Sequence, residues 1–310
     1  MVLDLGKGWD SEWVSNPSVV YNGFTFMMWY TGMDDNYVGS IGLATSVDGA
    51  SWSRYSNNPV LKGAQDPCVI YEDGIYKMWY SGDANVGSSI GYATSQDGIT
   101  WTRFTGNPVL SPGSFGSWDV GSLDQPSVVH QGSTYLMYYD ASKSGSSGIG
   151  MATSKDGMHW TKTGQLPNGA LGGWATLYEI GDVTSVNGSY VAVYWGGNHT
   201  LTQSIGIASS SDGVKWTPFE GNPILTPGPS SSWDGIAVLT PTLVHVRDQY
   251  YLYFSGWSYS QDLIITKIGM TILPATIPVP IPEFSSNITL TIAMTFAIIA
   301  SLSIRKRFRI

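Results

Sequence analysis

The sequence predicts an all-β fold: a five-bladed β-propeller over residues 1–273, followed by a linker and one C-terminal transmembrane helix. Two motifs each recur five times in constant register, with spacings close to the length of one four-stranded blade. Composition points the same way. Gly (37), Tyr (18) and Trp (13) are abundant and charged residues make up only 12%, as expected of many short strands joined by tight turns.

The first motif reads Ile-Gly-x-Ala-(Thr/Ser)-Ser-x-Asp-Gly-x-x-Trp. It occurs at 41–52, 90–101, 149–160 and 205–216, and a degenerate fifth copy begins at Ile268. The Ile-Gly pairs are 49, 59, 56 and 63 residues apart. An Asp-Gly pair supplies the positive φ angles of a tight hairpin, and we expect the Trp to pack between neighbouring blades. These positions are therefore interpreted as structural.

The second motif is a Pro, or a Gly in the fourth unit, that stands nine residues before an aromatic residue opening a strand-like run. The five marker residues are Pro17, Pro67, Pro126, Gly181 and Pro241. A Trp-Asp pair precedes the marker by eight residues in units one, three and five. The last unit lacks the Asp-Gly-Trp hairpin, so residues 2–5 are predicted to supply its outer strand and close the ring.

The innermost strands of such a ring line a narrow axial funnel, and we expect the residues just before these strands at its mouth. One position before the marker, the five units carry Asn16, Asp66, Gln125, Ile180 and Thr240. Two positions before it, they carry Ser15, Gln65, Asp124, Glu179 and Leu239. Three carboxylates thus fall at the entrances of blades two, three and four. Each alone can equally cap a turn or pair with local backbone donors, but their common register favours one shared site.

Glycoside cleavage needs what such a cluster offers, one protonated carboxyl and one ionised carboxyl. Crowding in a partly dry funnel separates the pKa values of chemically similar groups. The predicted catalytic residues are Asp66 as general acid or base, Glu179 as its partner, and Asp124 as a modulator of proton affinity or a sugar ligand.

Substrate-binding candidates surround the same columns. Asn16 and Gln125 are predicted to hydrogen-bond sugar hydroxyls, and Tyr178, Trp195 and Trp257 to stack on sugar rings. The four His residues have no metal-site spacing, and no pattern supports an axial calcium ion, so no metal or cofactor is expected. Cys68 is the single cysteine, which excludes an internal disulfide.

Over residues 9–273 the chain resembles the five-bladed propeller glycosidases, the superfamily of glycoside hydrolase families 32, 43, 62 and 130. Family 130, the mannoside phosphorylases and related hydrolases, looks closest over the first two blades. Ser15-Asn16-Pro17 resembles its Asn-Pro segment, and residues 41–49 and 58–61 resemble the stretch that follows. Gly63-Ala-Gln-Asp66-Pro67 resembles its Gly-x-Glu-Asp-Pro-Arg segment, whose Asp is the proton donor. The resemblance therefore implies Asp66 as the donor.

The departures keep alternatives open. Gln65 replaces the Glu of that segment and Cys68 replaces its Arg. No Arg or Lys cluster suited to phosphate appears in the later blades, so hydrolysis is favoured over phosphorolysis. Families 32 and 43 place an acidic base on the first blade, where this chain has Asn16. The alternatives are a non-catalytic propeller that binds glycans or surface-layer proteins, and a purely structural surface-layer component.

Charge restricts the partners. The formal net charge is -8, but the tail after Pro274 holds four basic residues and one acidic residue. The preceding part has 11 basic and 22 acidic residues, a balance of -11. Such a domain repels nucleic acid, whereas a neutral oligosaccharide or glycan is accommodated.

The tail predicts membrane attachment. Residues 274–284 form a Pro-rich linker that ends in Pro282-Glu283-Phe284, and residues 285–310 include 17 uncharged residues, 288–304, before a basic end. That length is at the lower limit for a spanning helix, and the basic end stays cytoplasmic. The tail also resembles the PEF-type sorting signals of archaeal surface proteins, which implies a sortase-like processing enzyme. We therefore expect a cell-surface protein facing outward. That topology normally needs an N-terminal signal peptide, and none is visible in the sequence.

Overall fold

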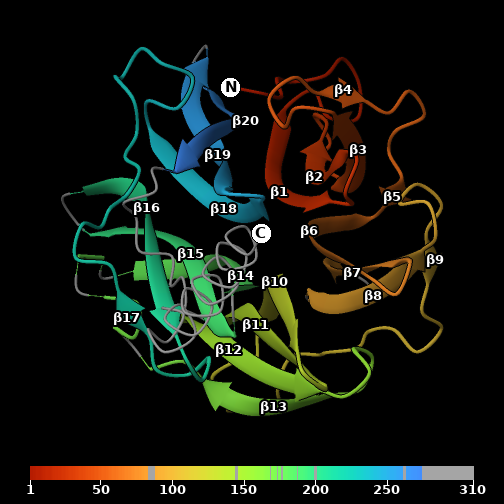
Figure 1. The fold of residues 1–310 in the computed structure, drawn as a ribbon, viewed down its shortest axis with the longest axis vertical. Helices are drawn as coiled ribbons and strands as arrows, with labels where there is room; N and C mark the ends of the chain where they lie inside the picture. Colours follow the sequence, from red (N-terminus) through yellow and green to blue (C-terminus); the bar gives the residue numbers. More distant parts are fainter. Residues whose placement is uncertain are drawn as a thin grey trace, which may run out of the picture.

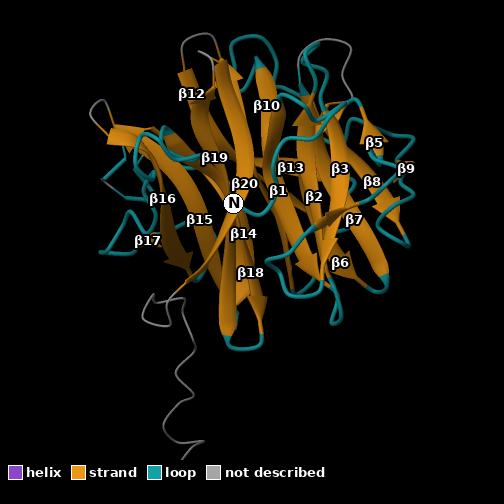
Figure 2. Ribbon diagram, turned by 90° about the horizontal axis from the view of Figure 1, so that it is seen from above, coloured by secondary structure: helices purple, strands orange, loops and turns teal. Residues whose placement is uncertain are grey.

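The computed structural model describes residues 1–82, 88–143, 146–167, 169–172, 174–175, 177–186, 188–198, 201–260 and 263–273. Five antiparallel sheets surround a central axis (Figure 1), so the predicted five-bladed propeller is confirmed. In the view turned by 90°, the strands run between two opposite faces (Figure 2). The predicted linker (274–284) and transmembrane helix (285–310) lie outside the described residues. Within those residues, no helix is long and apolar enough to cross a membrane.

Each blade is one sheet whose strands follow the chain order outward from the axis. Blade one holds β1 (Trp13–Tyr21), β2 (Phe26–Met33), β3 (Ser40–Ser46) and β4 (Ser53–Arg54), with β5 (Leu61–Lys62) paired to β3. Blade two holds β6 (Ala64–Glu72), β7 (Ile75–Gly82), β8 (Ser89–Ser95) and β9 (Thr102–Arg103). Blade three holds β10 (Ser122–Gln131), β11 (Thr134–Lys143), β12 (Ser146–Ser154) and β13 (Trp160–Gln165).

Blades four and five complete the ring. Blade four holds β14 (Leu177–Val186), β15 (Ser189–Asn198), β16 (Leu201–Ser210) and β17 (Thr217–Pro218). Blade five holds β18 (Ala237–Val246), β19 (Gln249–Ser260) and β20 (Leu263–Leu273). It is the only blade of the described chain with three named strands, as the missing hairpin in the sequence predicts.

The Asp-Gly hairpins differ from the tight two-residue turn that the sequence suggested. Only the Gly has a positive φ, between 74° and 77° at positions 49, 98, 157 and 213. The Asp instead caps the turn with its carboxylate. Asp48 Oδ1, for example, accepts from the backbone N–H groups of Ala50 and Ser51 at 2.8 and 2.7 Å. These hydrogen bonds hold the pKa of Asp48 well below its usual range, so the Asp residues are structural.

The Trp of each hairpin packs against the preceding blade, as predicted. Trp52 lies edge-on to Tyr253 of blade five and Trp101 to Trp29 of blade one, with ring centroids 5.6 and 5.9 Å apart. The aromatic residue that each hairpin Trp contacts also donates a hydrogen bond, from its indole N–H or phenol O–H, to the carbonyl of the hairpin Gly. These bonds are Trp29 to Gly98, Trp79 to Gly157, Tyr138 to Gly213 and Tyr253 to Gly49, at 2.5–2.9 Å.

One blade interface lacks this contact. Blade four has Val193 at the position of these aromatic residues, and the blade that follows it lacks the Asp-Gly hairpin. Donor and acceptor are therefore absent together. Each hairpin thus belongs to an interface between two blades, which is why the motif recurs in step with the ring.

The N-terminus closes the ring as predicted. Leu3 pairs antiparallel with Ile268 of β20, through backbone N–O distances of 3.0 and 3.1 Å. The Ile-Gly residues Ile41, Ile90 and Ile205 pair in the same way with Leu61, Leu110 and Leu225 of their own blades. In those three blades the leucine comes from the outer segment of the same blade, and in blade five Leu3 takes its place. Leu3 is buried, with 3% of its surface exposed.

Candidate functional site

The site begins at an irregularity that all five innermost strands share. The antiparallel register shifts at the marker residue in β1, β6, β10, β14 and β18. The marker columns therefore lie inside the innermost strands, and the expectation that they precede these strands is wrong. The strands extend about four residues further toward the mouth than the marker alone indicated.

At this bulge four residues adopt left-handed backbone angles. They are Asn16 (φ 50°), Asp66 (50°), Gln125 (51°) and Thr240 (44°). Such angles are unfavourable for residues other than Gly and persist only where the surrounding structure imposes them. All four line one axial cavity of about 20 Å³, together with the neighbouring marker residues. This volume has room for about one water molecule, so the funnel is nearly closed at this level.

Hydroxyl groups of one blade hold the bulge of the next. The Asp66 backbone N–H donates to Thr31 Oγ1 at 2.8 Å, and that of Gln125 donates to Ser81 Oγ at 3.0 Å. The Asn16 N–H donates to Ser255 Oγ at 3.1 Å. These acceptors stand five residues after the aromatic that opens the second strand of each blade. In blades three and four the same position holds Asp140 and Trp195.

Asp66 lies among other carboxylates. Burial is the largest cause that raises its pKa, to about 7, and the charges of Asp124 and Glu179 raise it further. Hydrogen bonds from Ser81 and the Gln125 backbone partly oppose this shift. The residue keeps part of its surface open to the funnel. Near neutral pH, Asp66 is therefore able both to donate and to accept a proton.

A fourth acid, Asp140, completes the cluster, and neither sequence motif marks it. It lies on β11 directly opposite Asp124 of β10. Burial, followed by the charge of Glu179 and a hydrogen bond to it, raises the Asp140 pKa well above its usual value. Asp140 Oδ2 is buried and has no hydrogen-bond partner among the described residues. Comparing the fifth residue after each opening aromatic across the blades would have found it.

Glu179 is the acceptor of this carboxyl pair. Burial and the charge of Asp124 raise its pKa, while hydrogen bonds from Asp140 and Gln125 favour its ionised form. Gln125 Nε2 donates to Glu179 Oε2 at 2.9 Å. A protonated Asp140 that donates to an ionised Glu179 satisfies both sets of preferences. The acids of blades two, three and four therefore act on one another within one funnel.

The structure places the remaining candidates differently. Trp195 is the cross-strand partner of Glu179, and its indole N–H is buried without a partner in the described chain. Trp257 lies on the blade-five side, in contact with Trp13. Tyr178 is not brought to the acids. Its hydroxyl accepts from Ala170 N–H and donates to the Pro167 carbonyl, at 3.0 and 3.2 Å.

Four carboxylates gather in this funnel. Across the part of the chain that the structure describes, however, no group of three or more His, Cys, Asp or Glu side chains has the geometry to hold a metal ion.

Comparison with known proteins gives the family. No protein-family model matches the chain. An uncharacterized protein of Mycobacterium tuberculosis, Rv1502 in strain H37Rv and MT1551 in strain CDC 1551, is 30% identical over 271 residues. The match covers 84% of this chain and 71% of that protein. The chain belongs to the Rv1502 family.

Solved structures that share the fold of this Rv1502-family chain include propellers of proteins that act on carbohydrates. A glycosyl hydrolase from Bacteroides ovatus superposes with a TM-score of 0.65 and 19% identity, covering 86% of this chain and 90% of that chain. A structure of the GH130 family of mannoside phosphorylases, which contains glycoside hydrolases that target β-1,2 mannosidic linkages in Candida mannan, gives a TM-score of 0.62 with 19% identity. It covers 84% of this chain and 85% of that chain.

A third neighbour is an N-acetylgalactosamine deacetylase from F. plautii, solved in complex with blood group B trisaccharide. Its TM-score is 0.69 at 17% identity, and the match covers 90% of this chain and 95% of that chain. At such identities the likeness establishes the shared fold, which hosts more than one reaction on sugars.

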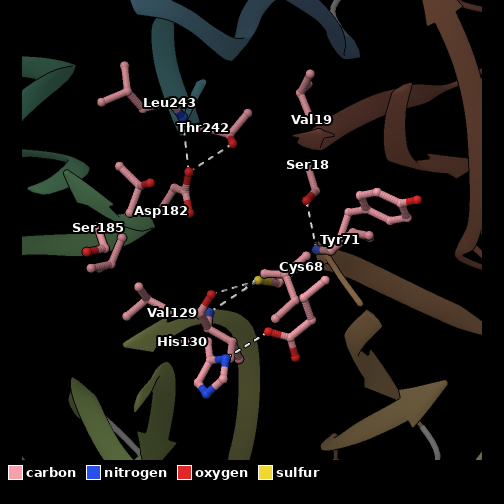
Figure 3. Close-up of a pocket in the computed structure, with 16 residues that line it drawn as sticks. Ser18, Val19, Cys68, Tyr71, Val129, His130, Asp182, Ser185, Thr242 and Leu243 are labelled. Atoms are coloured by element: carbon pink, nitrogen blue, oxygen red, sulfur yellow. Dashed lines mark hydrogen bonds and ion pairs between the residues drawn. The ribbon is translucent and has the colours of Figure 1, made fainter. Parts of the chain in front are cut away.

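This Rv1502-family protein has a second cavity, about 310 Å³ in volume, at the end of the funnel opposite the acids (Figure 3). One position after the marker, a side chain of each of blades one to four accepts from the backbone N–H of the next blade. These bonds run from Val69 to Ser18, Val128 to Cys68, Val183 to Ser127 and Leu243 to Asp182, at 2.8–3.2 Å. We call these four acceptors the clamp ring.

The clamp ring explains why a cysteine stands at position 68, where the family 130 segment has an Arg. Cys68 lines the second cavity (Figure 3), and burial raises the pKa of its thiol to about 12. The thiol therefore stays neutral and serves as a hydrogen-bond acceptor. The Arg that the family 130 resemblance places here has thus been replaced by a structural group.

Cys68→Ser is accordingly expected to keep the melting temperature or raise it slightly, because Ser18 and Ser127 do the same work in neighbouring blades. Cys68→Val removes the acceptor of the buried Val128 N–H and is expected to cost about 1–3 kcal/mol. Chemical denaturation of both variants measures the difference. Equal stability of the Ser and Val variants would contradict this role.

Proposed function

We propose that this protein is a glycosidase-like enzyme that hydrolyses glycosidic bonds of oligosaccharides at the acid cluster in its funnel. One observation carries the proposal. Asp66, Asp140 and Glu179 come from three adjacent blades, and the charges of neighbouring carboxylates, Asp124 among them, raise their pKa values. A pKa of about 7 at Asp66 suits a group that must carry a proton and release it near neutral pH.

The roles follow from the environment of each carboxyl. Asp66 donates its proton to the glycosidic oxygen as the bond to the anomeric carbon breaks. Glu179, whose ionised form is favoured by hydrogen bonds from Gln125 and Asp140, takes a proton from the attacking water. Asp140 keeps its own proton and acts as a hydrogen-bond donor. Asp124 raises the proton affinity of its neighbours through its charge and accepts hydrogen bonds from sugar hydroxyls.

Substrate contacts come from groups with unused polar atoms or with surface in the cavity. Asn16 and Thr240 line the axial cavity, and Trp195 has a buried N–H without a partner in the described chain. Gln125 acts chiefly on Glu179 through its hydrogen bond.

Hydrolysis is favoured over phosphorolysis. The charges that act most strongly on Asp66 and Asp140 are those of other carboxylates. A phosphate dianion placed beside these groups would be repelled, whereas water is not.

A non-catalytic glycan-binding propeller is the second candidate. The observation that favours it is Asn16, since an amide occupies the first-blade position where families 32 and 43 have an acidic base. Aryl glycosides, including β-mannosides, distinguish the two when assayed with and without phosphate. We expect release of the aryl alcohol at a rate independent of phosphate. Sugar binding without turnover across the panel would favour the second candidate, and turnover that requires phosphate would overturn hydrolysis.

We also propose that the propeller faces the cell exterior and is tethered by residues 285–310. The support is the uncharged stretch 288–304 followed by a basic end. Membrane fractionation of the full chain and of a chain ending at residue 273 tests this. Equal recovery of both chains in the soluble fraction would refute the anchor.

A further inference from the structure

The funnel is chemically asymmetric at the level of the bulge. Its acids come from blades two, three and four, whereas blades five and one contribute Thr240, Ser255 and Asn16. Thr240 Oγ1 and Ser255 Oγ are 2.6 Å apart, and Ser255 also accepts from the Asn16 N–H. One half of the funnel is therefore ionisable and the other half is neutral and polar.

Two tryptophans stand above the neutral half. Trp13 precedes Ser15 by two residues on β1, and Trp257 follows Ser255 by two residues on β19. Residues two apart on a strand face the same side, so both side chains lie one step nearer the mouth. Their rings meet edge to face, with centroids 5.8 Å apart and planes at 75°. Both remain partly exposed.

The other blades have non-aromatic residues at these two positions. Gly63, Ser122, Leu177 and Ala237 correspond to Trp13, and Met33, Ser142 and Gly197 correspond to Trp257. In the described part of these two columns, the tryptophans occur on blades one and five alone. The two tryptophans therefore form a wall at the mouth on the side of blades one and five.

The wall continues outward along blade five. β19 has 12 residues and β20 has 11, against 8 in β2 and 7 in β3, so this hairpin extends beyond its neighbour. Tyr259 lies two residues after Trp257, on the same side of the strand, and is 68% exposed. We call Trp13, Trp257 and Tyr259 the aromatic wall.

We infer that the aromatic wall is an extended sugar-binding surface, which holds the second and later residues of an oligosaccharide whose terminal residue lies among the acids. The constriction of about 20 Å³ cannot pass a sugar ring, so a bound chain must leave through the mouth. Exposed aromatic faces offer the apolar contact area that the C–H faces of sugars use. This inference rests on the proposed function and specifies a chain of three or more sugars as its substrate.

Length dependence tests the wall. The probes are two- and four-residue oligosaccharides from β-mannan, xylan and arabinan, together with the aryl monoglycosides. We expect Tyr259→Ala and Trp257→Ala to lower kcat/KM about tenfold on the four-residue probe. Turnover of the aryl monoglycoside should change less than about twofold in Tyr259→Ala, because Tyr259 is the wall residue farthest along β19 from Ser255. Tyr37→Ala, at a residue of blade one that is 64% exposed, is the matched control.

Binding measurements test the proposed sugar-binding surface independently of the proposed hydrolysis. If the wild-type protein turns over no aryl glycoside, the proposed hydrolysis fails, while calorimetric titration with the four-residue probes still tests the wall. Tighter binding of four-residue than of two-residue probes, lost in Tyr259→Ala, supports the wall. It is overturned if wild type shows no length preference with any probe, or if both wall variants keep that preference. Tyr259 is so exposed that its replacement leaves folding intact, even if Trp257→Ala fails to fold.

Discussion

Asp66→Asn is expected to lower turnover by about 10²–10⁴-fold, because the amide can neither donate nor accept the proton that moves between the acid and the glycosidic oxygen. The measurement is kcat on whichever aryl glycoside the wild-type protein cleaves, with the melting curve recorded beside it. Retained activity in a folded Asp66→Asn protein would remove Asp66 from the mechanism.

Asp140→Asn is the matched control within the same cluster. If Asp140 serves as a protonated donor to Glu179, an amide N–H can replace its O–H, and most of the activity should survive. Loss of activity equal to that of Asp66→Asn would instead assign a transferable proton to Asp140. The two variants remove one carboxyl each from one funnel, so the comparison separates loss of the proton-transferring group from a general effect of an amide in the cluster.

Asp66 also makes stability depend on pH. Its pKa is raised from 3.8 to about 7 on folding, so between these values the folded state holds a proton that the unfolded state has lost. The free energy of unfolding therefore falls as pH rises through this window. The difference in pKa amounts to at most ~4 kcal/mol, reduced by solvent that reaches the carboxyl through the funnel.

Asp66→Asn should accordingly be more stable than wild type at pH 7.5 and about equal to it at pH 4. Denaturant titrations of both proteins at the two pH values measure this. When a buried carboxylate is needed for activity but destabilises the fold, its replacement is expected to raise stability and to lower activity. A variant that is less stable at pH 7.5 would contradict the pKa assignment.

The sequence predicted the ring and its register because blade motifs repeat at fixed spacing, which made columns comparable across blades. That comparison brought Asp66, Asp124 and Glu179 into one funnel correctly. It missed Asp140, since this residue comes from the second strand, whose columns were not compared, and its position opposite Asp124 follows only from the cross-strand pairing. Strand pairing is a long-range property that no local motif encodes.

Three other features escape prediction for local reasons. The left-handed angles of Asn16 and Asp66 precede proline, where an extended backbone is the usual expectation, so the local sequence indicates the approach to a strand rather than a bulge. Tyr178 adjoins Glu179 in sequence, yet alternation along β14 directs neighbouring side chains to opposite faces. Applying that period would have separated the two residues. Cys68 departs from an enzyme pattern, although its column already holds Ser18 and Ser127.

Deleting residues 1–8 is expected to lower the melting temperature by roughly 10–20 °C. The deletion removes the backbone pairing of Leu3 with Ile268, the buried Leu3 side chain and the Asp4–Lys267 ion pair at 2.9 Å. Loss of the leucine alone costs about 2–5 kcal/mol, and the backbone hydrogen bonds add about 0.5–1.5 kcal/mol each. Differential scanning calorimetry measures the change.

Leu3→Ala is the control that keeps the backbone pairing, and it should show about half of that effect. The two results together separate closure of the ring from simple core packing, because only the deletion frees the β20 edge of blade five. Since blade five holds Trp257 and adjoins the funnel, the deletion should also weaken oligosaccharide binding at temperatures well below its melting point. An unchanged melting curve after deletion would show that the ring closes without its N-terminal strand.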